Sequence, residues 1–494
     1  MYIIDMKFIA KFILMLVYIS ILTSQIIEEH ILFDEDGNEL DVFAYQIPEN
    51  YNSNNSHPLL VAFHQWGGSQ MSPFSTQFDD EANARNWIFM SPFGGSSNNY
   101  NHQDAQEWVK LGIQWLEENY NIDSGRIYMV GGSMGGASGA IYANNHLNPT
   151  EPMVAATASA SGILDCERRA IEMDGNNSMI EWFGGDYDEV PFEYHRNSAV
   201  YFSDSTQSMH YNLQYTPLYL DFGQTETHRT HAEDLYNLLQ GYNHNMWIDT
   251  IPIGSHGYSV IDEVHTCDWF SQFELEDSPD TINVNLDEPS RIYWIEAYNQ
   301  FSDNDFIRIN ARIFYGDIWY SPIPWEGYGF FMNEYSNSDS LVLHVLDEEY
   351  STDNNITFYI DGELNNIGFT GPISNGSNIE NIHAFIINDD PICASFNFNM
   401  DEDNIIWVER YDLYDGICQS YTPYKVSFDF SLPEENDDIN QDGIWDILDI
   451  VLTVNFIMGN IDPTNIQFNF ADLNNDNILD VLDIVTMVNI IMGR

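Results

Sequence analysis

Residues 126–136 read Arg-Ile-Tyr-Met-Val-Gly-Gly-Ser-Met-Gly-Gly. The apolar run 127–130 predicts a buried strand, and the glycines after it predict a sharp turn. Small residues at 137–140 favour a helix that begins directly after the turn. The pattern G-x-S-x-G at 131–135 is typical of a serine held on a strained strand-to-helix turn with its hydroxyl projecting. The stretch therefore predicts that Ser133 is a nucleophile at the end of a buried strand.

The sequence around this stretch alternates strands and helices. Trp108, Leu111 and Trp115 share one face of a predicted helix. Such alternation is typical of a mostly parallel sheet with helices on its faces. We therefore predict one α/β domain over residues 25–275. Its further short apolar runs lie at 57–63, 87–92, 217–220 and 247–253.

A serine nucleophile needs a histidine base and an acid that orients the histidine, and in this class of sheet the chain order is serine, acid, histidine. His256 lies in a glycine-flanked loop after the run 247–253, from which it can return to Ser133. We therefore predict His256 as the base. The competing histidines, in helical or flanking contexts, are His228, His231, His244 and His265.

The predicted acid follows the strand at 217–220. Glu226 lies where the loop after this strand has turned, and a glutamate can orient an imidazole as an aspartate does. Asp221, at the start of the same loop, is the alternative, and Asp249 in the last strand is the third candidate. Glu226 is the prediction, with Asp221 left open.

An oxyanion formed at Ser133 requires two amide donors. The amide that follows the nucleophile is that of Met134. The second donor is expected from the loop after the first core strand, residues 64–68, where Trp66 or Gln65 supplies the amide. The Trp66 ring is also a candidate wall for an aromatic subsite.

These motifs resemble a group of α/β-hydrolase esterases. Residues 122–127, Ile-Asp-Ser-Gly-Arg-Ile, followed by the elbow at 131–136, are similar to the approach to the nucleophile in feruloyl esterases and polyhydroxybutyrate depolymerases. The resemblance covers the predicted α/β domain and implies an α/β-hydrolase fold. It also implies Ser133, Glu226 and His256 as the triad.

The sequence departs from that pattern at two positions. Gln65 stands where a His-Gly pair is usual, and Glu226 replaces the common aspartate. The run 183–187, with Pro191 and Tyr194, is also similar to prolyl-oligopeptidase-like hydrolases. The Ser-Met-Gly-Gly elbow is similar to that of cutinase-like polyester hydrolases.

These residues predict a serine carboxylesterase that acts through an acyl-enzyme without a catalytic cofactor. The expected substrate is polymeric: first an acylated plant or algal polysaccharide with feruloyl or acetyl esters, second a polyhydroxyalkanoate or aromatic polyester. The alternatives are a prolyl-oligopeptidase-like serine peptidase and a non-catalytic binding or scaffold protein.

Residues 276–432 contain short, aromatic-rich, alternating runs separated by turn residues. This pattern predicts a β-rich, sandwich-like accessory domain. Trp319 and Trp325 are candidates for stacking on sugar rings or on a polymer. A short linker at 432–436 leads into the last module, which we place at 433–494.

The last module contains an internal repeat. Residues 438–449 read Asp-Ile-Asn-Gln-Asp-Gly-Ile-Trp-Asp-Ile-Leu-Asp, and 472–483 read Asp-Leu-Asn-Asn-Asp-Asn-Ile-Leu-Asp-Val-Leu-Asp. Side-chain oxygens at positions 1, 3, 5, 9 and 12, with a carbonyl at position 7, suit Ca²⁺. Helix-like runs follow at 450–458 and 484–492.

This repeat resembles the dockerin family, modules with two calcium loops that attach secreted enzymes to cohesin partners. The resemblance implies two Ca²⁺ ions and a cohesin-like partner. Apolar residues stand at the recognition positions 447–448 and 481–482, where many dockerins have polar or hydroxyl residues. The implied ligands are Asp438, Asn440, Asp442, Ile444, Asp446 and Asp449 in one loop, and Asp472, Asn474, Asp476, Ile478, Asp480 and Asp483 in the other.

The start of the chain predicts secretion. Lys7 and Lys11 precede an apolar run from Phe12 to Leu22, which is typical of a signal peptide over residues 1–24. Secretion makes disulfides possible. The simplest expected pairs are Cys166 with Cys267 and Cys393 with Cys418, and other connectivities stay open.

The formal net charge is −62, from 77 acidic and 15 basic residues. This charge argues against binding to nucleic acid, whose phosphates need Lys and Arg, and against anionic membrane surfaces. We expect a solvated acidic surface and no membrane contact after signal cleavage.

Overall fold

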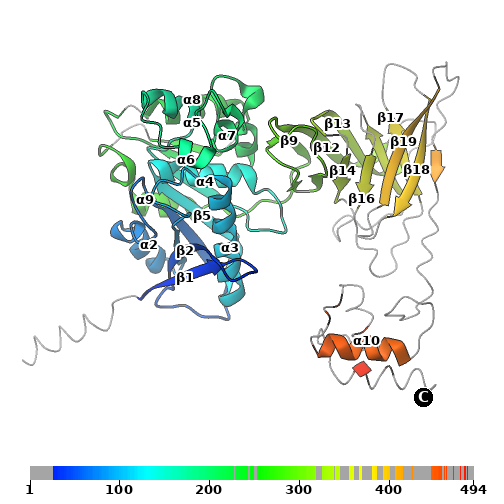
Figure 1. Cartoon of the computed structure of the whole chain (residues 1–494), viewed down its shortest axis with the longest axis horizontal. Coiled ribbons are helices and arrows are strands. Elements are labelled where there is room, and N and C mark those ends of the chain that lie inside the picture. Colours follow the sequence, from blue (N-terminus) through cyan, green and yellow to red (C-terminus); the bar gives the residue numbers. More distant parts are fainter. Residues whose placement is uncertain are drawn as a thin grey trace, which may run out of the picture. The chain divides into compact units, whose positions relative to one another are not determined.

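A computed structural model of the chain (Figure 1) describes residues 26–226, 229–242, 245–249, 253–318, 325–338 and 340–344. It also describes the strands named below between 355 and 426, residues 447–458, and positions 461, 463, 471, 479, 483, 484 and 487. The predicted signal segment 1–24 lies outside these residues. The chain divides into two compact units, 1–377 with 382–425, and 378–381 with 426–494.

The first half of the chain forms an eight-stranded sheet. The two strands at one edge, β1 and β2, pair antiparallel, β2 pairs antiparallel with β4, and all other pairs are parallel. This confirms an α/β-hydrolase-like fold with a mostly parallel sheet. The order across the sheet is β1 (Ile27–Phe33), β2 (Glu39–Gln46), β4 (Ile88–Pro92), β3 (His57–Phe63), β5 (Ile122–Gly132), β6 (Ala156–Ala160), β7 (Leu218–Asp221) and β8 (Met246–Ile248).

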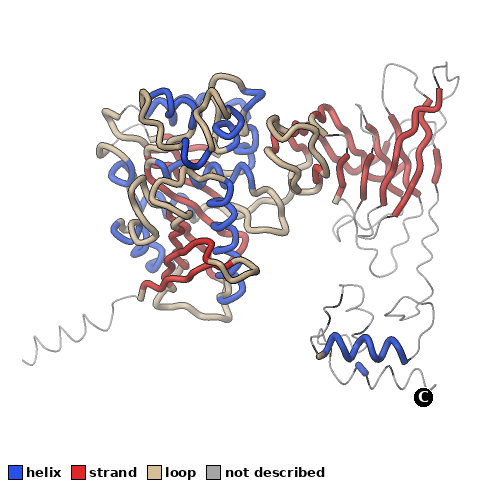
Figure 2. The backbone as a smooth tube through the Cα atoms, in the orientation of Figure 1, coloured by secondary structure: helices blue, strands red, loops and turns tan. Residues whose placement is uncertain are grey.

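Helices flank this sheet (Figure 2). The α-helices are α2 (Phe78–Ala84), α3 (Gln103–Asn119), α4 (Met134–Asn145), α5 (Cys166–Glu172), α6 (Ile180–Phe183), α7 (Pro191–Arg196), α8 (Arg229–Leu239) and α9 (Glu263–Phe270). Short 3₁₀ turns lie at η1 (Pro73–Ser75), η2 (Ser205–Gln207), η3 (His210–Tyr215), η4 (Gln240–Tyr242) and η5 (Gly257–Val260).

Strand β3 shows why a continuous apolar run is needed at the centre of the sheet. Leu59 and Val61 belong to the hydrophobic cluster that includes α3, α4 and α8. Leu60 and Ala62 belong to a second cluster that includes α2 and α9. Successive strand residues point to opposite faces, so a strand covered on both faces must be apolar at every position.

The middle of the chain is β-rich, with two six-stranded sheets. One sheet has the order β10 (Arg291–Ile292), β11 (Ile295–Ala297), β14 (Ser340–Leu343), β16 (Asn366–Phe369), β19 (Ile406–Tyr414) and β18 (Cys393–Met400). The other has the order β20 (Tyr424–Val426), β17 (Asn381–Ile386), β15 (Asn355–Ile360), β13 (Trp325–Ser336), β12 (Ile307–Ile318) and β9 (Thr281–Leu286). Trp325 begins β13, and Trp319 lies outside the described residues.

Buried polar contacts join the α/β domain to strand β9 and the residues after it. The Asn212 side chain donates to the Asn285 carbonyl at 2.8 Å, and the Asn285 amide donates back to Asn212 Oδ1 at 3.0 Å. Arg196 Nη2 lies 2.7 Å from Asp287 Oδ2, and both side chains are largely buried. The start of the β-rich region is therefore packed against the α/β domain.

The second unit contains helix α10 (Ile447–Ile457). Phe456, Ala471 and Met487 form a small buried cluster in this unit. Asp483 is fully buried there, and the side chain of Asp449 is outside the described set. The other proposed calcium ligands, residues 438–446 and 472–480 of the two loops, also lie outside the described residues.

The predicted disulfide between Cys166 and Cys267 is wrong, because both thiols are free and buried. Cys166 packs in a cluster with Tyr100 and Met134, and its Sγ donates to the Asn197 carbonyl at 3.1 Å. Cys267 belongs to the separate α2–α9 cluster. Burial raises the pKa of each thiol to about 12. For Cys393 and Cys418, the described residues do not include the side chains.

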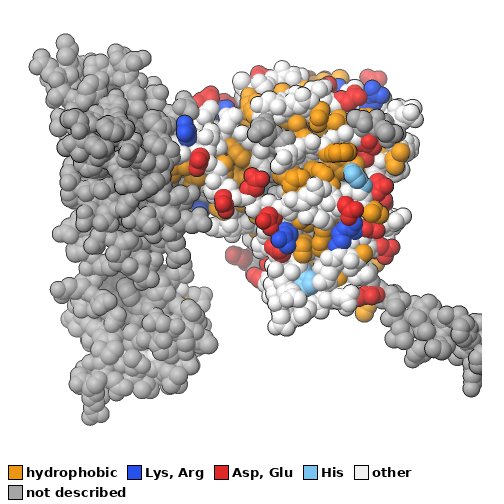
Figure 3. Space-filling model, turned by 180° about the vertical axis from the view of Figure 1, so that it is seen from behind, with side chains coloured by type: hydrophobic (Ala, Val, Ile, Leu, Met, Phe, Trp, Pro, Cys, Tyr) orange, Lys and Arg blue, Asp and Glu red, His pale blue; other side chains and the backbone are white. Residues whose placement is uncertain are grey.

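Figure 3 shows one face of the molecule, with Asp and Glu side chains scattered over the described surface and apolar patches between them. Among the residues that the structure describes, no helix combines the length and the apolar character required to cross a membrane.

Candidate active site

Ser133 lies on the turn between β5 and α4, where the sequence predicts it. Its φ of 57° and ψ of −119° are strained for a residue with a side chain, which costs about 1–3 kcal/mol. The flanking glycines permit this turn. A Cβ at Gly131 would lie 2.0 Å from the Gly135 carbonyl oxygen, and a Cβ at Gly135 would lie 2.5 Å from the His64 carbonyl oxygen. The turn therefore excludes side chains on both sides of the serine.

The structure brings Ser133, His256 and Glu226 together. His256 Nε2 lies 2.7 Å from Ser133 Oγ, and His256 Nδ1 lies 2.6 Å from Glu226 Oε2. The Glu226 side chain is 6% exposed, while that of His256 is 41% exposed. The three side chains thus form a continuous hydrogen-bonded chain from a buried acid to a serine near the surface.

Glu226 is kept in its charged form by its hydrogen bonds. Burial alone would raise its pKa, but hydrogen bonds to His256, to Ser161 and to the Gly223 amide outweigh burial and leave the pKa below its ordinary value. The Gly223 amide donates to Glu226 Oε1 at 2.6 Å. At neutral pH, Glu226 therefore presents a carboxylate to His256.

Asp221, the alternative acid, is directed elsewhere. Its carboxylate accepts hydrogen bonds from the Phe222 amide at 2.7 Å and from the Tyr219 hydroxyl at 3.3 Å. Burial raises the pKa of Asp221 to about 7. Asp249 follows β8, and its amide donates to the Leu220 carbonyl.

The competing histidines that the structure describes have other environments. His231 is fully buried, and its Nδ1 accepts hydrogen bonds from the amides of Leu164 and Asp165. His265 packs against Tyr219 and Trp247. His228 and His244 lie outside the described residues.

Ser161 is a site residue that the sequence analysis does not identify. It is fully buried, with a φ of 56°, directly after β6. Its hydroxyl hydrogen-bonds to the Glu226 carboxylate and accepts from the Gly257 amide at 2.9 Å. The one sequence signal is its place in the small-residue run 158–162. Ser161 therefore contacts both the acid and the loop that carries His256.

Backbone amides of the elbow and of the loop 64–68 are available as oxyanion donors. Met134 is the first residue of α4, so its N–H points out of a helix N-terminus, where anions are stabilised. In the loop 64–68, the amides of Gly67 and Gly68 donate to the carbonyls of Ser97 and Gln65. Within the described part of the chain, the amides of Met134, Gln65 and Trp66 have no such acceptor, so both alternatives for the second donor stay open. The close approach of Gly135 to His64 brings this loop beside the elbow.

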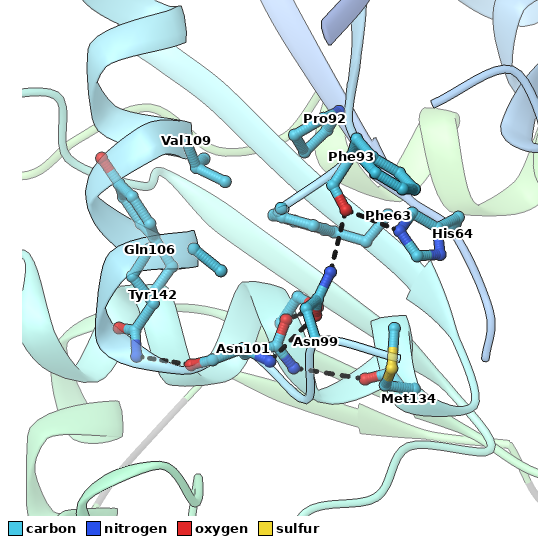
Figure 4. A pocket seen from close by; sticks show the side chains of 13 residues that line it. Phe63, His64, Pro92, Phe93, Asn99, Asn101, Gln106, Val109, Met134 and Tyr142 are labelled. Carbon is cyan, nitrogen blue, oxygen red and sulfur yellow. Dashed lines mark hydrogen bonds between the residues drawn. The ribbon is translucent and has the colours of Figure 1, made fainter. Parts of the chain in front are cut away.

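A small cavity lies behind Met134 (Figure 4). Its volume of about 20 Å³ holds about one water molecule. Asn99 donates to the Phe93 carbonyl at 2.9 Å, and the Asn101 side chain contacts the Met134 carbonyl at 3.4 Å. The Asn101 side chain therefore contacts the first turn of α4 from this cavity.

Two loops next to the triad residues expose large apolar side chains to solvent. Trp66 is 58% exposed, and Ile253, just before the histidine loop, is 52% exposed. Ser133 itself is half-buried. The serine is therefore in part accessible to solvent.

No protein-family model and no curated protein sequence matches this chain. Solved structures similar to it include FphF, a fluorophosphonate-binding serine hydrolase of Staphylococcus aureus, with 13% identity and a TM-score of 0.40 over 50% of this chain and 99% of that chain. A ferulic acid esterase has 14% identity and a TM-score of 0.34 over 50% of this chain and 96% of that chain. An acylaminoacyl peptidase of Pyrococcus horikoshii has 14% identity and a TM-score of 0.39 over 52% and 42%.

Proposed function

We propose that this protein is a serine hydrolase that cleaves carboxylic esters through an acyl-enzyme. The observation that carries the proposal is the hydrogen-bonded series Ser133, His256 and Glu226, with distances of 2.7 and 2.6 Å. A nucleophile in contact with a base that a third group orients is the arrangement that activates a serine. Its presence on a strained elbow argues against a purely non-catalytic scaffold.

In the first half of the reaction, Ser133 Oγ attacks the ester carbonyl carbon while its proton passes to His256 Nε2. Glu226 stabilises the resulting imidazolium. The amides of Met134 and Trp66 donate to the oxyanion. The proton on His256 then passes to the departing alkoxide, the carbon–oxygen bond to the alcohol breaks, and the acyl group stays on Ser133.

In the second half, a water molecule attacks the acyl carbon and gives its proton to His256. The second oxyanion collapses, the bond to Ser133 Oγ breaks, and His256 returns the proton to the serine. Apart from the ester and the attacking water, the groups in these steps are the side chains of Ser133, His256 and Glu226 and the two backbone amides.

We further propose a polymeric substrate, an acylated plant or algal polysaccharide with feruloyl or acetyl esters. The half-buried serine and the exposed Trp66 support this choice, because a large substrate can approach them and an aromatic ring can stack on an acyl or sugar group. The proposal also includes secretion, two Ca²⁺ ions in the loops 438–449 and 472–483, and a cohesin-like partner for this module. The sequence repeat and the buried Asp483 support the calcium part.

A substrate panel tests this proposal. Purified residues 25–494 and the Ser133→Ala variant would be compared on p-nitrophenyl acetate, methyl ferulate, acetylated xylan, an aliphatic polyester, an aromatic polyester and a proline-linked chromogenic peptide. Serine-dependent cleavage of methyl ferulate or acetylated xylan above the polyesters is expected. Preference for a polyester would replace the polysaccharide, cleavage of the peptide alone would replace the esterase by a peptidase, and equal inactivity of both proteins would contradict the triad.

A further inference from the structure

The side chain of Gln65 lies between the glycine that precedes the nucleophile, Gly132, and the glycine that follows the base, Gly257. Its Oε1 accepts a hydrogen bond from the Tyr258 amide at 3.1 Å. A Cβ built on Gly257 would lie 1.6 Å from this oxygen, and a Cβ built on Gly132 would lie 3.0 Å from it. The carboxamide therefore occupies the space left by the glycine before Ser133 and the glycine after His256.

We propose that Gln65 is a positioning residue that sets the separation of Ser133 and His256 and ties both to the oxyanion loop. The inference rests on the proposed hydrolase function. Gln65 belongs to the loop 64–68 through its backbone and to the histidine loop through its side chain. One residue thus joins the two loops that must act on the same tetrahedral intermediate.

The histidine loop needs such a support because it is glycine-rich and carries an exposed catalytic side chain. Gly254 and Gly257 have positive φ values of 67° and 60°, and His256 is exposed. Glycine loses more conformational freedom on ordering than other residues, so the loop must be held by specific contacts. Within the loop, Ser259 Oγ accepts from the His256 amide at 3.2 Å.

Two contacts from outside hold adjacent amides of this loop. Ser161, after β6, accepts from the Gly257 amide, and Gln65, after β3, accepts from the Tyr258 amide. Tyr258 is also fixed to β3 by its hydroxyl, which donates to the Phe63 carbonyl at 2.6 Å. Of these two contacts, only that of Gln65 comes from the loop 64–68, which carries an oxyanion donor. Its loss should therefore let His256 move relative to the oxyanion donors.

Loss of the Gln65 acceptor is therefore expected to slow the chemical step more than to weaken substrate binding. A displacement of about 1 Å in a catalytic group can cost about 10²-fold in rate. Gln65 itself contacts no reacting atom in this scheme, so KM should change little. A falling kcat at constant KM separates a positioning role from a binding role.

The test compares Gln65→Met, which keeps the length of the side chain and removes the acceptor, with the matched control Gln70→Met. Gln70 lies in the same segment, and its side chain makes an exposed hydrogen bond to Glu29. With p-nitrophenyl acetate, Gln65→Met should lower kcat by about 10- to 100-fold with KM within about twofold, while Gln70→Met stays near wild type.

A second variant, Gln65→Glu, retains an oxygen acceptor and is compared with Gln70→Glu. It should recover kcat above the value of Gln65→Met. Its acidic limb of kcat/KM should move to higher pH, because a negative charge beside His256 favours the imidazolium. If Gln65→Met does not fold, the pH dependence of Gln65→Glu tests the proposal instead.

Equal kcat in Gln65→Met and Gln70→Met would overturn the role of Gln65 while leaving the hydrolase proposal intact. If Gln65→Met does not fold, an acidic limb of kcat/KM at the same pH in Gln65→Glu and Gln70→Glu would do the same. Equal inactivity of wild type and Ser133→Ala would instead overturn the hydrolase proposal and, with it, the role of Gln65. The two failures are distinguishable because the second is visible before any Gln65 variant is measured.

Discussion

The hydroxyl of Ser161 accepts a hydrogen bond from the amide of Gly257 at 2.9 Å. The same hydroxyl hydrogen-bonds to the Glu226 carboxylate, so one buried side chain contacts both the acid and the loop that carries His256. Ser161 thereby couples the charge of the acid to the position of the base.

Ser161→Ala should therefore change the pH dependence of the reaction. The hydroxyl lowers the pKa of Glu226, and its removal should raise that pKa. Glu226 would then be protonated at a higher pH, so the acidic limb of kcat/KM should move upward in pH. A hydrogen bond to a charged group is worth about 1.5–3 kcal/mol, so we expect a loss of about tenfold or more in kcat/KM near the limb.

Ser159→Ala is the matched control for this measurement. Ser159 lies on β6 and is also buried, but its hydroxyl has no hydrogen-bond partner among the described residues. The control should keep the wild-type pH profile. An unchanged profile in Ser161→Ala as well would contradict a role of Ser161 at Glu226.

The choice of acid predicts opposite outcomes for two similar substitutions. Glu226→Gln should lower kcat by about 10³- to 10⁴-fold, because the amide cannot stabilise the imidazolium. Asp221→Asn should stay within about threefold, since the Asp221 carboxylate hydrogen-bonds to Phe222 and Tyr219 rather than to His256. Steady-state rates with p-nitrophenyl acetate decide between them. A large loss in Asp221→Asn with a small one in Glu226→Gln would exchange their roles.

Asp221 also predicts a pH dependence of stability. Burial raises its pKa from 3.8 to about 7, so between these values the folded protein binds a proton that the unfolded chain has released. The contribution of Asp221 to the free energy of unfolding should therefore fall as pH rises from about 4 to about 7. The Tm of Asp221→Asn minus that of wild type should increase over this range. A constant difference would contradict the raised pKa.

The sequence predicts the central strands because they are continuous apolar runs. The predicted run 57–63 coincides with β3, and β5 extends the predicted strand backward to Ile122. Strand β6 lacks this signal, since Ala156–Ala160 consists of small residues. They are small because α4 packs closely on this strand: a Cβ at Gly139 would lie 2.2 Å from Thr157 Oγ1. Ser161 follows β6 and therefore escapes a search based on apolar runs.

Some residues of the site can be predicted from the local sequence, while the others depend on contacts between segments that are distant in the sequence. Ser133 is predicted by the G-x-S-x-G motif, because the glycines that permit the strained turn are part of the motif itself. The choice of Glu226 over Asp221 depends on the path of the loop after β7, and the role of the Gln65 side chain depends on two glycines distant in sequence. The wrong disulfide has the same origin, because spacing along the chain does not reveal that Cys166 and Cys267 pack in separate clusters.

The repeat at 438–449 and 472–483 predicts two Ca²⁺ sites in the full chain. Calorimetric titration with CaCl₂ should give about two bound ions, because each loop supplies one set of oxygen ligands. Asp438→Ala and Asp472→Ala should each remove one site, while Asp437→Ala, an acidic neighbour outside the pattern, should keep both. Saturable binding that none of the loop variants reduces, or no binding at all, would contradict the proposed sites.

Covalent labelling of Ser133 is the most direct test of whether this serine is an activated nucleophile. The full chain would be treated with diethyl p-nitrophenyl phosphate, from which an activated serine displaces p-nitrophenolate to form a bond from Oγ to phosphorus. We expect one diethylphosphoryl group per chain, located at Ser133 by peptide mass mapping. Labelling should be abolished in Ser133→Ala and strongly slowed in His256→Ala. Labelling at another residue, or equal labelling of wild type and Ser133→Ala, would contradict the account.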